Sequence, residues 1–189
     1  MFHRRPAVKM LLGDRPDNLL AVSGLGSSTW DLTASGDDAR NFCFIGAMGQ
    51  AGAFALGLAM AQPQKRIVLF TGDGELLMSL GILATIANQA PSNLAVLVMD
   101  NVAYVETGGQ PTATAGPTDL EAIARGAGIK ATRTVTEESE LTDLRSYMLT
   151  EPGPAFANLK IIKEALPLVF PHSFDGVTAV NRFRDAATR

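Results

Sequence analysis

The sequence predicts an α/β protein in which a doubly wound, mostly parallel sheet lies between two layers of helices. Short apolar runs alternate along the chain with longer helix-forming segments, which is typical of parallel strands joined by crossover helices. Two of the runs, residues 66–70 and 94–99, are almost continuously hydrophobic, as expected for strands buried on both faces. A hydrophobic content of 47% in 189 residues suffices for one core, so residues 1–189 are treated as a single domain.

The elements follow from these patterns in chain order. β-branched and aromatic residues favour strands in the apolar runs. Strands are expected at residues 19–22, 42–45, 66–70 and 94–99, with weaker candidates at 132–135 and 155–159. Helices are expected at residues 49–60, 75–89, 118–126 and 138–149.

Two of the expected helices have further features, and the chain ends in a distinct segment. Residues 49–60 are almost wholly small and apolar, which allows a close approach to a neighbouring element. Thr118 and Glu121 have the spacing of a capping box at the start of their helix. Residues 166–189 contain two prolines and are expected to be a tail that packs on another surface or stays mobile.

Composition excludes several classes of function. The net charge of −3 gives no reason to expect nucleic acid or an anionic membrane as a partner. Arg4 and Arg5, like the arginines near the C-terminus, are expected to be solvated because charged side chains are mostly exposed. No segment approaches the roughly 18 apolar residues that cross a bilayer, and residues 1–12 do not resemble a signal peptide.

The single cysteine, Cys43, cannot form a disulfide within the chain and fits a reducing cytoplasm. It lies in an apolar run without a basic neighbour in sequence, so we interpret it as a packed core residue rather than a nucleophile. His3 and His172 lie near the termini and are interpreted as exposed residues rather than bases in a site.

A Gly-Asp-Gly turn joins the buried run 66–70 to the next expected helix. Gly72, Asp73, Gly74 and Glu75 stand where ligands bind in open parallel sheets, at the carboxyl end of a strand. Glycines let the backbone approach a ligand, and the N–H groups of a helix start suit a phosphate. Alone, the motif is equally consistent with a plain turn.

The following strand makes the ligand interpretation stronger. Residues 94–99 lead into Asp100 and Asn101, so two neighbouring strand ends are expected to bring Asn101 beside Asp73. A carboxylate, a carboxamide oxygen and phosphate oxygens are suitable ligands for Mg²⁺. A backbone carbonyl near Ala103 would complete the contribution of the protein.

Together, these motifs resemble those of thiamine diphosphate-dependent enzymes. The resemblance rests on Gly72-Asp73-Gly74 followed by Asp100-Asn101, on the intervening residues 75–86, and on residues 104–112. It extends from about Val22 to about Lys160 and is nearer to sulfopyruvate and phosphonopyruvate decarboxylases than to pyruvate decarboxylase or acetolactate synthase. It implies a thiamine diphosphate-binding fold, the cofactors thiamine diphosphate and Mg²⁺, and a 2-keto acid substrate.

The resemblance assigns roles to particular residues. It implies that Asp73, Asn101 and the carbonyl of Ala103 bind Mg²⁺. It places the diphosphate beside two groups of residues: Gly74 and Glu75, and Gly26, Ser27 and Ser28. It also implies that Gly72, Tyr104 and Val105 bind the cofactor. A Gly-Ser-Ser turn also offers N–H and hydroxyl donors on physical grounds, although Ser27 and Ser28 fit a simple helix cap as well.

Residues 45–49 resemble the pyrimidine-binding turn of the same family. The resemblance implies that the Gly46 carbonyl accepts a hydrogen bond from the cofactor, and that Met48 wedges under its bent form. As an alternative, Met48 fills the core. Gln50 differs from the histidine common in phosphonopyruvate-type enzymes, which leaves the substrate open.

The acid that activates the cofactor is missing from the pattern. In this family, a glutamate of the pyrimidine-binding domain has that role, and the glutamates of this chain lie within or after the diphosphate-binding pattern. No catalytic residue is therefore assigned to this chain. The resemblance implies a partner chain with a pyrimidine-binding domain, in a hetero-oligomer of the α2β2 type or larger.

Other interpretations remain open from sequence. The chain fits a carboligase or lyase acting on another 2-keto acid, and a cofactor-binding module or flavodoxin-like nucleotide binder without catalysis. The lack of a Gly-x-Gly-x-x-Gly pattern counts against a dinucleotide. Residues 104–112 contain Gly108 and Gly109 and could close over a cofactor, with Glu106 facing either substrate or solvent.

Overall fold

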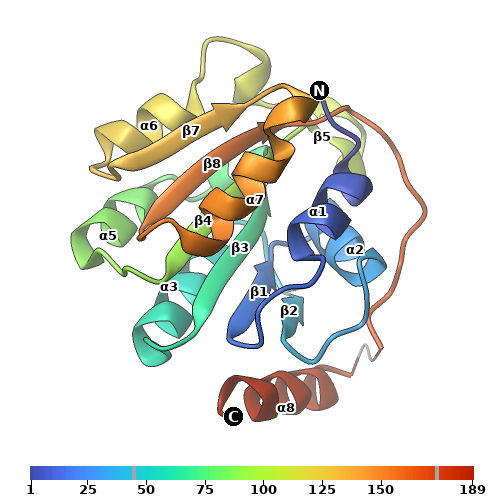
Figure 1. Ribbon diagram of the computed structural model, residues 1–189. Helices are drawn as coiled ribbons and strands as arrows, with labels where there is room; N and C mark the ends of the chain where they lie inside the picture. The colour runs from blue at the N-terminus through green and yellow to red at the C-terminus, as the bar shows by residue number, and fades with distance from the viewer. Residues whose placement is uncertain (44–45, 173–174) are drawn as a thin grey trace.

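The computed structural model describes residues 1–43, 46–172 and 175–189, and it has a parallel sheet between two layers of helices (Figure 1). The sheet has six strands in the order β2-β1-β3-β4-β8-β7, and all of its neighbouring pairs are parallel. The predicted fold class is therefore confirmed. The strands are β1 (Leu19–Ser23), β2 (Asn41–Cys43), β3 (Arg66–Gly72), β4 (Leu94–Asp100), β7 (Ala131–Val135) and β8 (Ala155–Lys160).

The strand order contains a switch point beside β1. From β1 the chain moves outward to β2, then returns to place β3 on the other side of β1 and continues to β4. Crossover connections at such a point diverge, which leaves a crevice outside the carboxyl ends of the strands. β3 and β4 are almost wholly buried, as their continuous hydrophobicity predicted.

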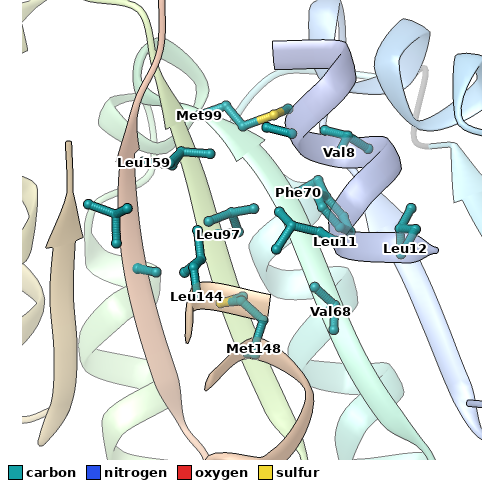
Figure 2. Packing of buried hydrophobic residues seen from close by; sticks show 14 of the residues in the cluster. Val8, Leu11, Leu12, Val68, Phe70, Leu97, Met99, Leu144, Met148 and Leu159 are labelled. Carbon is teal, nitrogen blue, oxygen red and sulfur yellow. The ribbon is translucent and has the colours of Figure 1, made fainter. Parts of the chain in front are cut away.

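One face of the sheet is covered by three helices, α1 (Arg4–Leu12), α2 (Ser27–Ala34) and α7 (Leu141–Thr150). Figure 2 shows how Val8, Leu11 and Leu12 of α1 and Leu144 and Met148 of α7 meet side chains of the central strands. These strand residues are Val68, Phe70, Leu97, Met99 and Leu159. Burial of each such side chain stabilises the fold by about 1.5–3 kcal/mol relative to exposure.

The opposite face is covered by α3 (Ala51–Ala61), α5 (Gly81–Gln89), α6 (Leu120–Gly126) and α8 (Gly176–Ala187). The small residues predicted to allow close approach are present in α3, where Ala51, Ala55 and Ala59 are buried against the sheet. A short hairpin of β5 (Ala103–Tyr104) and β6 (Gln110–Pro111) lies beyond the end of β4. The 3₁₀ turns are Val105–Thr107, Ala113–Ala115 and Glu138–Glu140.

The helix expected at residues 75–89 is two helices, α4 (Asp73–Leu77) and α5. The break coincides with a tertiary contact, because a Cβ placed on Gly49 would lie 3.2 Å from Cβ of Met78 and 3.3 Å from Cβ of Ser79. The turn before α3, in which Gly49 has a φ of +80°, thus packs on residues 78–79, at the point where a continuous helix would run. Intrinsic helix preference is overridden here by packing.

One smaller expectation was wrong. The capping box at Thr118 and Glu121 does not form, because Asp119 is the N-cap of α6 and accepts a hydrogen bond from the N–H of Ala122 at 3.0 Å. Aspartate is among the strongest N-cap residues. Cys43 is half-buried and packs against the core, as the sequence predicted, and burial raises the pKa of its thiol to about 11.

Both ends of the chain are more ordered than the sequence predicted. Residues 4–12 form α1, and Arg4 is 2% exposed rather than solvated, because it faces the buried carboxylate of Asp31. The C-terminal segment contains α8, whose Phe183 packs edge to face on Phe42 with ring centroids 5.1 Å apart. Part of the expected strand 42–45, at residues 44–45, lies outside the described residues.

Candidate cofactor site

The ends of β3 and β4 bring the two predicted metal ligands together. Gly72 pairs with Met99 across the strands, so Asp73 and Asn101 follow at the same edge of the sheet. The backbone N–H of Asn101 donates a hydrogen bond to the Asp73 carboxylate, and both side chains are buried. This juxtaposition is the one that the sequence predicted from neighbouring strand ends.

A cavity of about 140 Å³ opens at this edge, at the carboxyl ends of β1, β3 and β4. Its wall contains twelve of the thirteen residues that the sequence assigned to cofactor binding. They are Gly26, Ser27, Ser28, Met48, Gly72, Asp73, Gly74, Glu75, Asn101, Ala103, Tyr104 and Val105. Residues far apart in sequence thus form one concave surface, at the place where open α/β sheets bind ligands.

Gly46 is the exception. It borders a larger cavity of about 400 Å³, between α8 and the β2 edge of the sheet. Ile45, the first residue of the expected pyrimidine turn, lies outside the described residues. The larger cavity lacks the groups at the ends of β3 and β4, so we place the candidate site in the smaller one.

Asp73 is the charged centre of the site. Burial raises its pKa, the nearby Asp100 carboxylate raises it further, and a hydrogen bond from Thr112 lowers it. Its Oδ2 accepts from Thr112 Oγ1 at 2.5 Å and lies 3.1 Å from Thr114 Oγ1. A cation beside Asp73 would offset the repulsion between these two buried carboxylates.

Asp100 connects the site to the interior of the sheet. It is 1% exposed and pairs with Lys160 at the end of β8. Its Oδ1 accepts from Thr114 Oγ1 at 2.8 Å, and its Oδ2 accepts from Asn158 Nδ2 at 3.2 Å. Thr114 therefore bridges the two carboxylates and fixes the loop after β6 against the strand ends.

Asn101 and Ala103 form a tight turn after β4. The Asn101 Oδ1 accepts from the N–H of Ala103 at 3.0 Å, and Val102 between them has a φ of +56°, which is strained for a β-branched residue. A carboxamide oxygen has a second lone pair, so this bond leaves one acceptor site for a cation. No group of three His, Cys, Asp or Glu side chains suited to a metal occurs among the described residues, so a metal here needs carboxamide and backbone oxygens.

Tyr104 explains one of the motif glycines. A Cβ placed on Gly74 would lie 2.4 Å from Cε1 of Tyr104, a distance that a side chain cannot adopt. The absence of a side chain at residue 74 thus lets the β5–β6 hairpin lie directly over the start of α4. This contact closes one side of the cavity.

The start of α2 forms another wall. Gly26 is the N-cap with a φ of +86°, and neither serine acts as a side-chain cap there. Instead, Ser27 Oγ donates a hydrogen bond to Glu106 Oε1 at 2.7 Å. Glu106 is exposed but lines the cavity, so a carboxylate oxygen already lies at the N-terminus of this eight-residue helix.

Glu75 has a structural role that the sequence did not indicate. Its side chain is 3% exposed and accepts from Thr71 Oγ1 at 2.8 Å. Burial raises its pKa, while the Thr71 hydroxyl and the backbone N–H groups of Ala51, Leu25 and Gly49 lower it. The carboxyl group therefore lies between the loop before α2 and the turn before α3, the two segments that flank the cavity.

Sequence reasoning missed four polar residues in or around this cavity: Arg4, Asp31, Thr112 and Thr114. Thr112 ends the segment 104–112, whose similarity was noted without a role for this side chain, and Thr114 lies two residues beyond it. Arg4 and Asp31 are 27 positions apart and share no motif. Asp31 lies between the apolar residues Trp30 and Leu32, but Arg4 lies between His3 and Arg5, so no local pattern indicates their pairing.

A parallel sheet with buried oxygen ligands at its switch point defines a domain that binds a phosphorylated cofactor. A family model described as "Thiamine pyrophosphate enzyme, C-terminal TPP binding domain" matches residues 29–159, more than half of the chain. The chain belongs to this family, and thiamine diphosphate is the cofactor of the domain. Among the described residues, no helix is long and apolar enough to span a bilayer.

Two named relatives show which members of the family this chain is similar to. The chain is 37% identical over 158 residues to phosphonopyruvate decarboxylase of Streptomyces viridochromogenes, covering 84% of this chain and 39% of that protein. It is 35% identical over 161 residues to sulfopyruvate decarboxylase subunit beta of Methanothermobacter thermautotrophicus, covering 85% of this chain and 83% of that subunit. The chain thus spans less than half of the former and most of the latter.

A solved structure supports the fold independently. Benzoylformate decarboxylase from Polynucleobacter necessarius superposes with a TM-score of 0.73 at 20% identity, covering 88% of this chain and 34% of that one. At this identity the likeness concerns the fold alone.

Proposed function

We propose that this chain is the diphosphate-binding subunit of a two-chain thiamine diphosphate-dependent 2-keto acid decarboxylase. Its substrate would be of the sulfopyruvate or phosphonopyruvate type. The observation that supports this most directly is the buried Asp73–Asn101 pair at the switch point, in a chain that covers 83% of a sulfopyruvate decarboxylase beta subunit. We expect the protein to act in the cytoplasm.

The donor set fits Mg²⁺. Asp73 offers a buried carboxylate oxygen, Asn101 a carboxamide oxygen and Ala103 a backbone carbonyl, all in the wall of one cavity. These are hard oxygen ligands, which Mg²⁺ prefers, and the phosphate oxygens and water would supply the remainder. Asp100, which is paired with Lys160, holds Asp73 in place through Thr114.

The diphosphate would lie between the starts of α2 and α4. Gly26, Ser27 and Ser28 supply donors from one side, and Gly72, Gly74 and the backbone of Glu75 supply them from the other. In this arrangement Glu106 must leave Ser27, because a carboxylate and a phosphate compete for the same hydroxyl. Met48, in the cavity wall, would support the bent form of the cofactor.

When bound, the cofactor supplies a nucleophilic carbon and accepts the electrons that remain after carbon dioxide leaves a 2-keto acid. The residues of this chain bind and orient it. The acid that protonates the far ring nitrogen is assigned to a partner chain with a pyrimidine-binding domain, in an α2β2-type assembly. Glu75 does not suit that role, because its carboxyl group faces Thr71 and Gly24.

A reconstitution experiment tests this function. The chain is purified alone and with a pyrimidine-domain chain, each with Mg²⁺ and thiamine diphosphate, and carbon dioxide release is measured with sulfopyruvate, phosphonopyruvate and pyruvate. We expect activity only in the complex, and loss of that activity when Asp73→Asn replaces the wild-type subunit. Full activity of the chain alone would refute the two-chain hypothesis, and acyloin products without an aldehyde would favour a carboligase.

A further inference from the structure

Arg4 is the most deeply buried cation in the described parts of the chain. It lies in the first turn of α1, and its side chain is 2% exposed. Burial of a guanidinium is expensive unless it is paired and its N–H groups are bonded. The buried position of the five guanidinium N–H donors of Arg4 therefore needs an explanation.

The pairing of Arg4 is incomplete. Its Nε lies 3.4 Å from Asp31 Oδ2, an ion pair in which neither atom forms a hydrogen bond. Its Nη1 is buried and has no hydrogen-bond partner among the residues that the structure describes. A buried donor without a partner costs about 1–3 kcal/mol, so such groups usually mark a missing ligand or water.

Arg5 provides the contrast. It pairs with the same carboxylate, and its Nε donates to Asp31 Oδ1 at 3.0 Å while its Nη2 donates to the Pro167 carbonyl. Its side chain is 20% exposed and is not part of the cavity wall. Asp31 therefore has a second, well-bonded arginine partner, so its pairing does not depend on Arg4 alone.

Arg4 is part of the wall of the cofactor cavity. Arg4 and Asp31 both line it, together with Ser27, Ser28 and Asp73. Asp31 is one helical turn beyond Ser27, so α2 places its serine donors and the carboxylate that fixes Arg4 in the same wall. The Glu106 carboxylate at Ser27 shows that an oxyanion fits there.

We propose that Arg4 is an oxyanion-binding residue of this cavity and that its Nη1–H donates to an oxygen of the cofactor's diphosphate. Arg5 and Asp31 are positioning residues that hold the α1 start against α2. This inference rests on the proposed cofactor site, which it extends by a cationic residue outside every motif of the sequence. A guanidinium is suited to phosphate because its planar N–H groups match the oxygens.

The test compares ligands that differ in their phosphates. The full-length chain with Mg²⁺ is titrated calorimetrically with inorganic pyrophosphate, thiamine diphosphate and thiamine. We expect Arg4→Met to weaken binding of pyrophosphate and thiamine diphosphate at least about tenfold, the factor for one lost charge-assisted hydrogen bond, and to leave thiamine unaffected. Arg4→Lys should retain part of the affinity, because the charge remains while the planar donors are lost.

The matched control is Lys9→Met, which removes an exposed cation from the same helix and should leave pyrophosphate affinity unchanged. Thermal unfolding in the absence of ligand checks that each variant is folded. Should Arg4→Met not fold, the ratio of pyrophosphate to thiamine affinity in Arg4→Lys decides the question, because a structural ion pair does not change this ratio.

The outcomes separate the two proposals. If the wild-type chain binds neither pyrophosphate nor thiamine diphosphate, the cofactor site and the role of Arg4 both fail. If it binds both ligands and Arg4→Met binds them as tightly, only the role of Arg4 is overturned. Unchanged pyrophosphate binding with a raised KM for phosphonopyruvate relative to pyruvate would assign Arg4 to the substrate instead and would equally overturn the proposal.

Discussion

At the residue scale, the site is held by hydrogen bonds that come from outside its motifs. Thr112 and Thr114 are in no recognised ligand position, yet Thr112 donates to Asp73 Oδ2 and the Thr114 hydroxyl lies 3.1 Å from the same oxygen. Thr114 also bonds to Asp100, so the carboxylate expected to bind a metal is oriented by a residue 41 positions away. Partners of this kind orient metal ligands and affect affinity strongly.

We therefore expect Thr114→Val to weaken Mg²⁺-dependent binding of thiamine diphosphate by about tenfold, because Asp73 loses a neighbouring hydroxyl and the two carboxylates lose their bridge. Calorimetric titration at saturating Mg²⁺ measures the dissociation constant. Thr85→Val, at an exposed position on α5, is the matched control. A Thr114→Val variant with unchanged affinity but lower stability would show that the bridge serves folding alone.

Gly24 is a second residue whose identity depends on a partner outside its segment. A Cβ at this position would lie 1.4 Å from Glu75 Oε2, and the carboxylate is too confined to move away. Gly24→Ala should therefore destabilise the fold by about 1–3 kcal/mol, as overpacking of a core does. Denaturant titration checks this value.

Two companion variants isolate the cause of the Gly24 effect. Gly24→Ala combined with Glu75→Ala should recover much of the loss, because the colliding carboxylate is gone. Gly57→Ala, at an exposed site on α3 where a Cβ meets nothing within 4 Å, should be neutral or stabilise the helix by up to about 1 kcal/mol. An equal loss in both glycine variants would refute the collision as the cause.

Asp31 gives a pH dependence with a definite sign. Burial raises its pKa from 3.8 to about 6, against the opposing effect of Arg4. Between pH 3.8 and about 6 the folded chain binds more protons than the unfolded chain. The contribution of Asp31 to the free energy of unfolding is therefore largest below pH 4 and falls as the pH rises to about 6. The size is about 3 kcal/mol at 1.36 kcal/mol per pKa unit.

The measurement compares denaturant unfolding of wild type and Asp31→Asn between pH 4 and pH 7. The difference in unfolding free energy should change by about this amount across the window and stay constant above pH 7. Asp17→Asn, at an exposed carboxylate, should show no such change. A wild-type stability that rises relative to Asp31→Asn through the window would contradict the assigned sign.

At the element scale, hydrophobic patterning predicted the strands and failed where a helix depends on distant partners. The strands β3 and β4 were predicted because they are buried on both faces and leave continuous apolar runs in the sequence. α1 and α2 were missed because their polar inner residues, Arg4 and Asp31, interrupt the apolar pattern while pairing with each other. The break between α4 and α5 depends on Gly49, which is close to it only in three dimensions.

The same reasoning explains which part of the site was predictable. Asp73 and Asn101 follow adjacent strands, so their proximity follows from the order of a parallel sheet alone. Arg4 enters the cavity from α1, whose position depends on packing against α2 and α7. No spacing rule connects residue 4 to residue 73, and only the folded chain brings them into one wall.

α8 illustrates an element that is stabilised by few contacts. Phe42 stacks on Phe54 with centroids 4.1 Å apart, and Phe183 of α8 packs edge to face on Phe42. Phe183→Ala should lower the free energy of releasing α8 from the sheet by about 3 kcal/mol, the usual value for a buried phenylalanine. Hydrogen exchange in residues 176–187, and tryptic cleavage after Arg182 and Arg184, report on this release.

The control for α8 is Val177→Ala, because Val177 is 71% exposed and should leave both readouts unchanged. The sheet and the cavity at its carboxyl edge should keep their exchange rates in Phe183→Ala. A loss of protection throughout the chain would show instead that α8 is part of the main cooperative unit.

At the scale of the whole molecule, the site joins segments from six regions of the chain. The cavity wall takes residues from α1, the α2 start, the turn before α3, the ends of β3 and β4, and the residue after β8. A ligand that contacts all of them stabilises the folded chain and has no equivalent site in the unfolded one. Binding should therefore appear as a shift in global stability rather than as a local change.

Thermal unfolding with Mg²⁺ and thiamine diphosphate tests this coupling. At a free cofactor concentration one hundred times its dissociation constant, the stabilisation should be about 2.7 kcal/mol. For a chain of this size, that corresponds to a rise in Tm of about 5–10 °C. Removal of Mg²⁺ with a chelator should reverse the rise in Tm at a constant cofactor concentration. Asp73→Asn should abolish the rise in Tm, because the diphosphate is then held without its cation. A Tm shift that survives both changes would show that the cofactor binds elsewhere, and the assignment of Asp73 and Asn101 as metal ligands would be wrong.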